Sequence, residues 1–178
     1  MADLSIDLGF LKLRNPVLAA SGTFGYGLEF APFIDLERLG GIIVKGLYFY
    51  PRPGNSPPRL AESPSGLINS IGLQGIGVKA FSQEILPRLA GLRTTVIVNV
   101  CGSTNEEYGQ VIEFLDREEG IAAYELNISC PNLEQDGLCP ALSPEATQAI
   151  VRLAKRTSRR PIIAKLSPNV TDIVTIAR

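Results

Sequence analysis

The sequence predicts an α/β fold in which helices cover the outer face of a parallel sheet. Several expected strands are continuous apolar runs, for example residues 95–100, and segments with helical periodicity separate them along the chain. Continuous apolar strands that alternate with helices are typical of parallel sheets buried on both faces. The chain has 178 residues, of which 45% are apolar and 20% charged, so it can bury a sizeable core. We therefore expect residues 1–178 to form a single domain.

The expected elements follow one another in a regular order. Residues 4–8 and 11–13 are expected to form a small hairpin, ahead of a short buried strand at 16–20 and a helix at 29–39. Further strands are expected at 41–44, at 95–100, from Tyr124 onward, and at 161–166. Further helices are expected at 78–90, at 105–118 with Ser103 or Thr104 as cap, at 144–157 with Pro144 in the first turn, and at 171–178.

Composition and charge exclude several classes of function. The net charge is −1 and the pI about 5.6, which indicates neither nucleic-acid binding nor a polybasic membrane patch. The first seven residues lack the features of a signal peptide, and no apolar run approaches the length of a membrane span. We therefore expect a cytoplasmic protein with no nucleic-acid or membrane partner.

The rare residue types restrict the chemistry further. Cys101, Cys130 and Cys139 fit neither a disulfide framework nor a CxxC metal motif, so reduced thiols are expected. Histidine is absent, which removes Ser-His-Asp and Cys-His catalysis and the commonest zinc sites. No metal site is predicted. Acid–base chemistry would therefore fall to cysteine, lysine or a carboxylate.

The stretch 125–132, Glu-Leu-Asn-Ile-Ser-Cys-Pro-Asn, is the most informative in the chain. It begins as a strand, and Pro131 ends the strand because proline has no N–H to donate. Cys130 is therefore expected at a strand-to-loop junction among amides and a hydroxyl, where the pKa of a thiol can be tuned. A lone cysteine more often simply fills a turn, but the neighbouring polar residues favour a functional role.

Polar residues recur at the carboxyl ends of four expected strands. They are Lys45, Asn99, Asn127 and Lys165. Because side chains alternate between the two faces of a strand, each lies on the same face as the residue two positions before it. We expect them at one level, at the mouth of a parallel barrel, where active sites are built. Each alone could equally be a strand-end residue that turns to solvent. Glu125 would lie one layer deeper, and we expect it to pair with a lysine in a structural role.

The segment between residues 47 and 76 is expected to be a long functional loop without regular structure. Prolines stiffen it at positions 51, 53, 57, 58 and 64, which argues against disorder. Gly66 and Gly72 would let the backbone approach a flat ligand, and Asn69 can both donate and accept hydrogen bonds. A plain surface loop is the alternative. Arg52 and Arg59 are interpreted as solvated surface rather than as site residues.

Five motifs together resemble the class 1 dihydroorotate dehydrogenases, which use a cysteine base. They are Ser21–Gly25, Val44–Gly46, Pro57–Arg59, Asn69–Gln74 and Asn127–Asn132, and the similarity extends over the whole chain. The Ser-Gly-Thr-Phe-Gly turn and the run Pro51–Asn55 are most similar to class 1B catalytic subunits. That subclass passes electrons to NAD⁺ through a separate subunit that carries FAD and a [2Fe–2S] cluster. A class 2 enzyme would have an N-terminal membrane-associating helix and a serine base.

The resemblance implies a (β/α)₈ TIM barrel that holds FMN at its mouth. Such a barrel needs roughly 250 residues, so the chain is expected to be an N-terminal part that supplies the hairpin and about the first five βα units. The implied reaction is the oxidation of dihydroorotate to orotate in pyrimidine (UMP) biosynthesis. Cys130 would take a proton from C5, and hydride would pass from C6 to FMN.

The resemblance also implies roles for individual residues and partners. FMN would be held by Ser21, Gly22, Lys45, Gly46, Asn99, Asn127 and Lys165. The substrate would be held by Lys45, Asn69, Ser70, Ile71, Gly72, Leu73, Asn127 and Asn132. A homodimer that binds the iron–sulfur/FAD subunit to give a heterotetramer is implied as well. Cys101 and Cys139 match no role in the family, so Cys101 is expected in the core and Cys139 in a loop.

Two other functions stay open at this stage. The chain could belong to a related flavoenzyme that acts on another dihydropyrimidine. It could also be a non-catalytic half-barrel that serves as a binding or assembly module.

Overall fold

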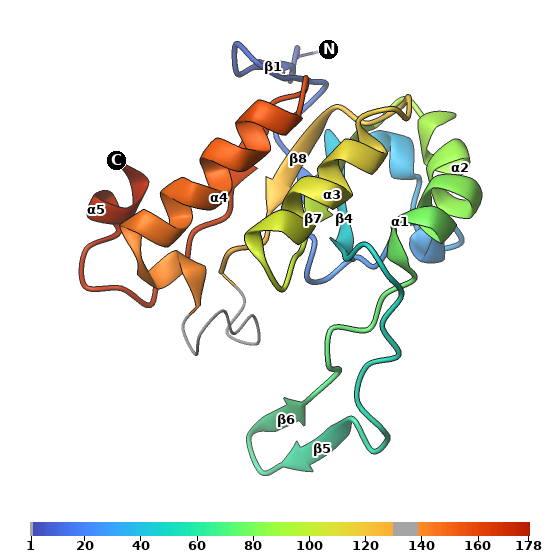
Figure 1. The fold of residues 1–178 in the computed structure, drawn as a ribbon. Coiled ribbons are helices and arrows are strands. Elements are labelled where there is room, and N and C mark those ends of the chain that lie inside the picture. Colours follow the sequence, from blue (N-terminus) through green and yellow to red (C-terminus); the bar gives the residue numbers. More distant parts are fainter. Residues whose placement is uncertain (1, 130–138) are drawn as a thin grey trace.

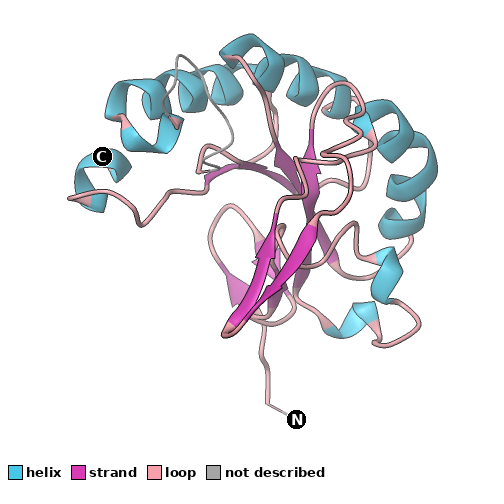
Figure 2. Ribbon diagram, turned by 90° about the horizontal axis from the view of Figure 1, so that it is seen from below, coloured by secondary structure: helices cyan, strands magenta, loops and turns pink. Residues whose placement is uncertain are grey.

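The computed structural model describes residues 2–129 and 139–178, and its central feature is a five-stranded parallel sheet. The strands lie in the order β3 (Leu18–Ala19), β4 (Gly41–Leu47), β7 (Thr95–Val100), β8 (Ala123–Leu126) and β9 (Ile162–Ala164). The helices lie in an arc along one side of these strands (Figures 1 and 2). This arrangement is part of a (β/α) barrel, so the predicted parallel α/β architecture is confirmed.

The helices occur close to the predicted positions. They are α1 (Gly77–Ala80), a π-helical turn (Phe81–Ile85), α2 (Leu86–Ala90), α3 (Asn105–Leu115), α4 (Pro144–Thr157) and α5 (Ile173–Ala177). Thr104 caps α3, because its hydroxyl accepts a hydrogen bond from the N–H of Glu107. Within the described part of the chain, none of these helices has the length and apolar character needed to cross a membrane.

The predicted helix at 29–39 is wrong. The structure has two short 3₁₀ turns instead, Leu28–Phe30 and Leu36–Arg38. Pro32 lies between them and has no N–H for a helical hydrogen bond. The second turn has its own cap, since the Asp35 carboxylate accepts from the N–H of Glu37. The side chain of Phe33 is 81% exposed, so the apolar periodicity of this segment did not mark a buried face.

The segment 47–76 contains regular structure, contrary to the expectation of a loop without any. It contains a β-hairpin of β5 (Leu60–Ser63) and β6 (Gly66–Asn69), with Ser63 paired to Gly66. The hairpin projects from the body of the protein (Figure 1). Period-2 alternation could not reveal it because both of its faces are exposed, including Leu60, Leu67 and Ile68.

The inner face of the sheet changes from apolar to polar along the strands. Near the amino ends, Ile43, Ile97 and Ala123 pack together. The N-terminal hairpin of β1 (Ile6–Asp7) and β2 (Lys12–Leu13) covers this cluster with Leu11 and Leu13. It lies at the opposite end of the molecule from β5 and β6 (Figure 1). One end of the inner face is therefore closed by apolar side chains, which leaves the carboxyl ends of the strands for a site.

A buried carboxylate ties the end of α3 to the segment between α4 and β9. The carboxylate of Asp116 accepts from Arg159 Nε at 2.9 Å and from Arg160 Nη1 at 2.8 Å. Burial by itself raises the pKa of Asp116, but the hydrogen bonds from the two arginines outweigh it and hold this pKa below its usual range. This cluster therefore stabilises the folded state most when Asp116 is ionised.

We predict that Asp116→Asn lowers the free energy of unfolding by about 1–3 kcal/mol at pH 7, because it removes charge-assisted hydrogen bonds from a buried position. A carboxyl whose pKa is lowered by folding stabilises above its unfolded pKa of about 4, and this contribution disappears as the pH falls through the lower folded value. Urea unfolding at a series of pH values should therefore show the difference between wild type and variant shrinking as the pH falls below about 4.

The matched control is Glu113→Gln, which removes the exposed ion pair between Glu113 and Arg117. It should change stability by less than about 0.5 kcal/mol. An Asp116→Asn effect that is equally large at both ends of the pH range would contradict the assigned role of the charge.

Candidate functional site

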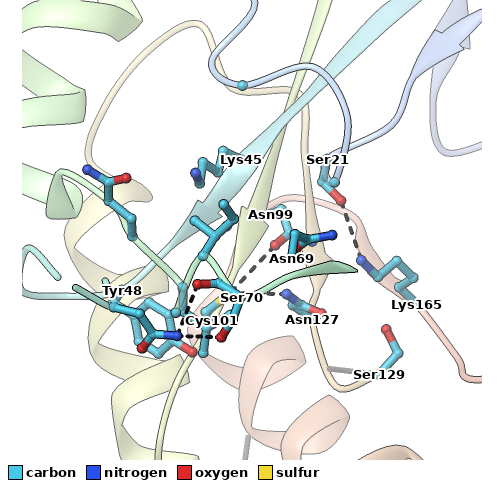
Figure 3. A pocket seen from close by; sticks show the side chains of 18 residues that line it. Ser21, Lys45, Tyr48, Asn69, Ser70, Asn99, Cys101, Asn127, Ser129 and Lys165 are labelled. Carbon is cyan, nitrogen blue, oxygen red and sulfur yellow. Dashed lines mark hydrogen bonds between the residues drawn. The ribbon is translucent and has the colours of Figure 1, made fainter. Parts of the chain in front are cut away.

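A cavity of about 780 Å³ lies at the carboxyl ends of the strands, beside the segment 47–76. Its size is in the range of small-molecule and cofactor sites. Figure 3 shows the side chains that line it. They are Ser21, Gly22, Gly25, Lys45, Gly46, Tyr48, Asn55, Asn69, Ser70, Ile71, Gly72, Leu73, Gln74, Asn99, Cys101, Asn127, Ser129 and Lys165. The structure thus brings together every predicted site residue except Cys130 and Asn132, which lie outside the described residues.

Two lysines give the cavity its charge. Lys45 comes from β4 and Lys165 follows β9, so residues 120 positions apart in the sequence line one space. The Nζ of Lys165 donates to the hydroxyl of Ser21 at 3.4 Å (Figure 3). No carboxylate is among the described lining residues. This imbalance of charge favours an anionic or electron-rich ligand.

Glu125 lies just beneath the cavity, and its contacts differ from those predicted. Its side chain is buried, and Oε1 accepts from Ser21 Oγ at 2.8 Å and from Asn99 Nδ2 at 2.5 Å. The expected lysine partner is therefore wrong: among the described residues Glu125 forms no ion pair, and Lys165 reaches it only through Ser21. Its structural role, however, agrees with this burial and bonding.

The strand register also corrects the expectation of a single polar level. Asn99 is paired with Glu125 across β7 and β8, and Glu125 is paired with Ile163 on β9. Asn127 and Lys165 are therefore one inward-facing position further along their strands than Asn99. The twist and stagger of a barrel still bring all of them to the same cavity.

Cys101 is a pocket residue that the sequence analysis missed. It is buried, as expected of a core residue, but it also lines the cavity. Its Sγ–H donates to Asn99 Oδ1 at 3.6 Å, and its sulfur accepts from Asn127 Nδ2 at 3.3 Å. The signal was present in the sequence, because position 101 has the same parity as Ile97 and Asn99. Cys139 is elsewhere, with its thiol donating to the carbonyl of Ile128 at 3.1 Å.

Gly46 allows backbone and side chains to meet closely in the wall. A Cβ at this position would lie 2.5 Å from Cys101 Sγ and 2.8 Å from Asn99 Oδ1. Both distances are far shorter than real carbon contacts, so only glycine leaves these two side chains where they are. Gly72, on the loop, has a φ of +75°, a conformation that other residues rarely adopt.

Arg59 holds the cavity side of the loop together and is not merely solvated surface. Its guanidinium donates to Gln74 Oε1 at 2.6 Å and to the carbonyls of Asn55 and Pro53. Asn55 in turn donates through Nδ2 to both the carbonyl and the hydroxyl of Ser70. Two segments of the loop that are far apart in sequence are thereby joined along the cavity.

Arg52 connects the base of the same loop to the body of the protein. Its guanidinium lies 3.7 Å from the centre of the Tyr48 ring and also donates to Ser103 Oγ at 2.5 Å. Its backbone pairs with that of Gly75 in both directions. Arg52 is therefore half-buried rather than fully solvated, although, as expected, it is not one of the residues that line the cavity.

Comparison with known proteins identifies the family. Residues 4–178 match the family model described as dihydroorotate dehydrogenase. The chain belongs to the dihydroorotate dehydrogenase family. It is 51% identical over 176 residues to dihydroorotate dehydrogenase B (NAD(+)), catalytic subunit, of Geobacter sp. (strain M21), an alignment that covers 99% of this chain and 58% of that protein. The protein of the same name from Bacteroides thetaiotaomicron is 49% identical over 178 residues, which is 100% of this chain and 59% of that one.

The chain thus spans less than two thirds of the length of the curated relatives that it matches. The family implies a flavin cofactor. The cavity residues suit one, because lysine, asparagine and serine side chains supply donors for the nitrogen and oxygen acceptors of an isoalloxazine ring.

We predict that Gly46→Ala lowers the free energy of unfolding by about 1–3 kcal/mol, because the added methyl must displace Cys101 and Asn99 from the wall. Urea unfolding would measure the change.

The control is Gly91→Ala. An added Cβ there meets only ordinary contacts, with the carbonyl of Arg88 at 3.6 Å, and the position lies outside the cavity. We expect a change below about 0.5 kcal/mol. If Gly46→Ala were as mild as Gly91→Ala, the wall would be looser than the structure indicates.

Proposed function

We propose that the protein is the catalytic subunit of a dihydroorotate dehydrogenase, which oxidises dihydroorotate to orotate with FMN in pyrimidine biosynthesis. The observation that carries the proposal is the convergence of two lysines and the amides of the strand ends on one cavity. Family membership and the names of the relatives support it. In this proposal residues 1–178 form one FMN-binding domain whose active-site loop is the segment 47–76.

Cys130 is the proposed base that takes the proton from C5 of dihydroorotate. Support comes from the sequence, where Cys130 directly follows the cavity residue Ser129, and from the absence of histidine. A free thiol has a pKa of about 8.5, so the site must favour the thiolate for this transfer at neutral pH. FMN, when bound, supplies the acceptor for the hydride that leaves C6.

The remaining cavity residues are proposed to bind and orient. The positive charge of Lys45 would balance the carboxylate of the substrate. The planar pyrimidine would be held by hydrogen bonds and contacts from Asn69, Ser70, Ile71, Gly72, Leu73, Asn127 and Asn132. FMN would be held by Ser21, Gly22, Lys45, Gly46, Asn99, Asn127 and Lys165. All residues of both sets line the same cavity, apart from Asn132, which lies outside the described residues.

The names of the relatives also support a proposal about partners. They are called catalytic subunits of an NAD(+)-linked enzyme, which implies a second, separate subunit. We propose that this subunit carries FAD and a [2Fe–2S] cluster, passes electrons to NAD⁺, and forms a heterotetramer with a homodimer of this protein in the cytoplasm. The three cysteines of the sequence are widely spaced and fit no disulfide framework, as expected in a reducing compartment.

We predict that Cys130→Ala slows the anaerobic bleaching of bound flavin by dihydroorotate about 10²- to 10⁴-fold, because a general base contributes about that much. The flavin content of the purified variant should stay close to that of wild type. Stopped-flow absorbance under anaerobic conditions measures the rate.

Cys139→Ala is the matched control, because it removes a second thiol that lies outside the described cavity, and its bleaching rate should match that of wild type. Equal rates for Cys130→Ala and wild type would remove the cysteine from its proposed role.

Dihydrouracil in place of dihydroorotate tests the alternative substrate, and faster bleaching by dihydrouracil would overturn the proposed specificity. Protein purified without flavin that binds no orotate would instead favour the assembly module.

A further inference from the structure

Beneath the cavity, a continuous chain of hydrogen bonds joins four side chains of two neighbouring strands and their extensions. Glu125 Oε1 accepts from Asn99 Nδ2 at 2.5 Å, and Asn99 Oδ1 accepts from Cys101 Sγ at 3.6 Å. Cys101 Sγ then accepts from Asn127 Nδ2 at 3.3 Å. Figure 3 shows that three of these residues, Asn99, Cys101 and Asn127, lie together in the wall of the cavity.

The direction of every bond in this chain follows from Glu125. A carboxylate has only acceptors, so Asn99 must turn its NH₂ group toward it and its carbonyl oxygen away. The reversed amide would place two acceptor oxygens against each other at the separation of 2.5 Å that Asn99 now bridges. The buried position of both side chains leaves no water to relieve such a contact.

The same argument continues through the thiol. Because Asn99 presents Oδ1 to Cys101, the thiol donates its one hydrogen there, and its sulfur lone pairs are left for Asn127. Asn127 therefore turns its NH₂ group toward Cys101. A reversed Asn127 would set its own oxygen against those lone pairs.

The carbonyl oxygen of the Asn127 side chain indicates that the contact with the Cys101 sulfur fixes the orientation of this amide. Its Oδ1 is shielded from solvent and has no hydrogen-bond partner among the described residues. A buried carbonyl without a partner is unfavourable, so the contact with Cys101 holds the amide against this cost. Since Oδ1 is shielded, Nδ2 is the polar group through which Asn127 lines the cavity, and its second hydrogen is available to a ligand.

We propose that Cys101 and Glu125 are positioning residues, which fix the side-chain amide of Asn127 so that it presents an N–H donor to a carbonyl oxygen of the bound pyrimidine. This inference rests on the proposed function and specifies how the site recognises the ring. Ligands with an acceptor at this point are selected over ligands with a donor. Neither positioning residue needs to contact the ligand.

Orotate binding to the full-length protein tests the proposal, with the dissociation constant measured by isothermal titration calorimetry. Cys101→Ala removes both the donor and the acceptor, and it should weaken orotate binding about 3- to 10-fold, the effect of one hydrogen bond. Cys101→Ser keeps a group that can donate and accept, so it should restore binding to within about twofold of wild type. Glu125→Leu, which removes the acceptor that orients Asn99 at similar side-chain size, should weaken binding as Cys101→Ala does.

A double-mutant cycle with Asn127→Ala shows whether these effects pass through Asn127. In the Asn127→Ala background, Cys101→Ala and Glu125→Leu should each change the dissociation constant less than twofold. If they weaken binding equally in both backgrounds, or if Cys101→Ser binds as poorly as Cys101→Ala, the positioning role is overturned. Glu125→Leu serves the same test if the cavity left by Cys101→Ala prevents folding.

The outcomes separate this inference from the proposed function. Wild-type protein that binds no orotate would overturn the function, and the inference with it. Wild-type protein that binds orotate while all three single variants bind equally well would overturn only the inference.

Discussion

The burial of one carboxylate beneath the cavity is the constraint on which the rest of the site depends. A charged group out of contact with water must be surrounded by donors, and Glu125 obtains them from Ser21 on one side and Asn99 on the other. These two contacts join the loop after β3 to β7 and β8. The polar layer at the strand ends is therefore a connected network, and Lys165 and Asn127 are its two outer members.

The apolar part of the inner face, near the amino ends of the strands, makes this network possible. Ile43, Ile97 and Ala123 fill the space under the polar layer, and Leu11 and Leu13 of the N-terminal hairpin seal it from below. With water excluded on that side, the hydrogen bonds around Glu125 have little competition from solvent. The hairpin, which contributes nothing to the cavity wall, thus supports the chemistry from the opposite end of the strands.

Much of this arrangement could be predicted from the sequence, because periodicity and chain order are local properties. The parallel sheet, most of the helices and the inward parity of Lys45, Asn99 and Lys165 follow from them. The predictions that were wrong depended on contacts between distant segments. A lysine partner for Glu125 was reasonable from charge alone, but the hydroxyl that takes its place comes from residue 21. Cys130 and Asn132 stay predictions, since they lie outside the described residues.

The predictions for the loop beside the cavity were incomplete for a similar reason. Arg52 and Arg59 look like surface charges in sequence, and only the folded loop shows the carbonyls and the ring that they meet. The exposed hairpin of β5 and β6 left no periodic signal, because neither face is buried. Sequence patterns report burial well, whereas hydrogen bonds between segments of a loop have no such pattern.

The contacts of Arg59 have a thermodynamic consequence for whatever enters the cavity. Its guanidinium fixes Pro53, Asn55 and Gln74 relative to one another, and these hydrogen bonds exist before any ligand arrives. A loop that is already ordered loses little conformational entropy when it closes on a small molecule, so more of the contact energy remains as affinity. Arg59 therefore contributes to binding strength through the free state of the protein, without being one of the residues that line the cavity.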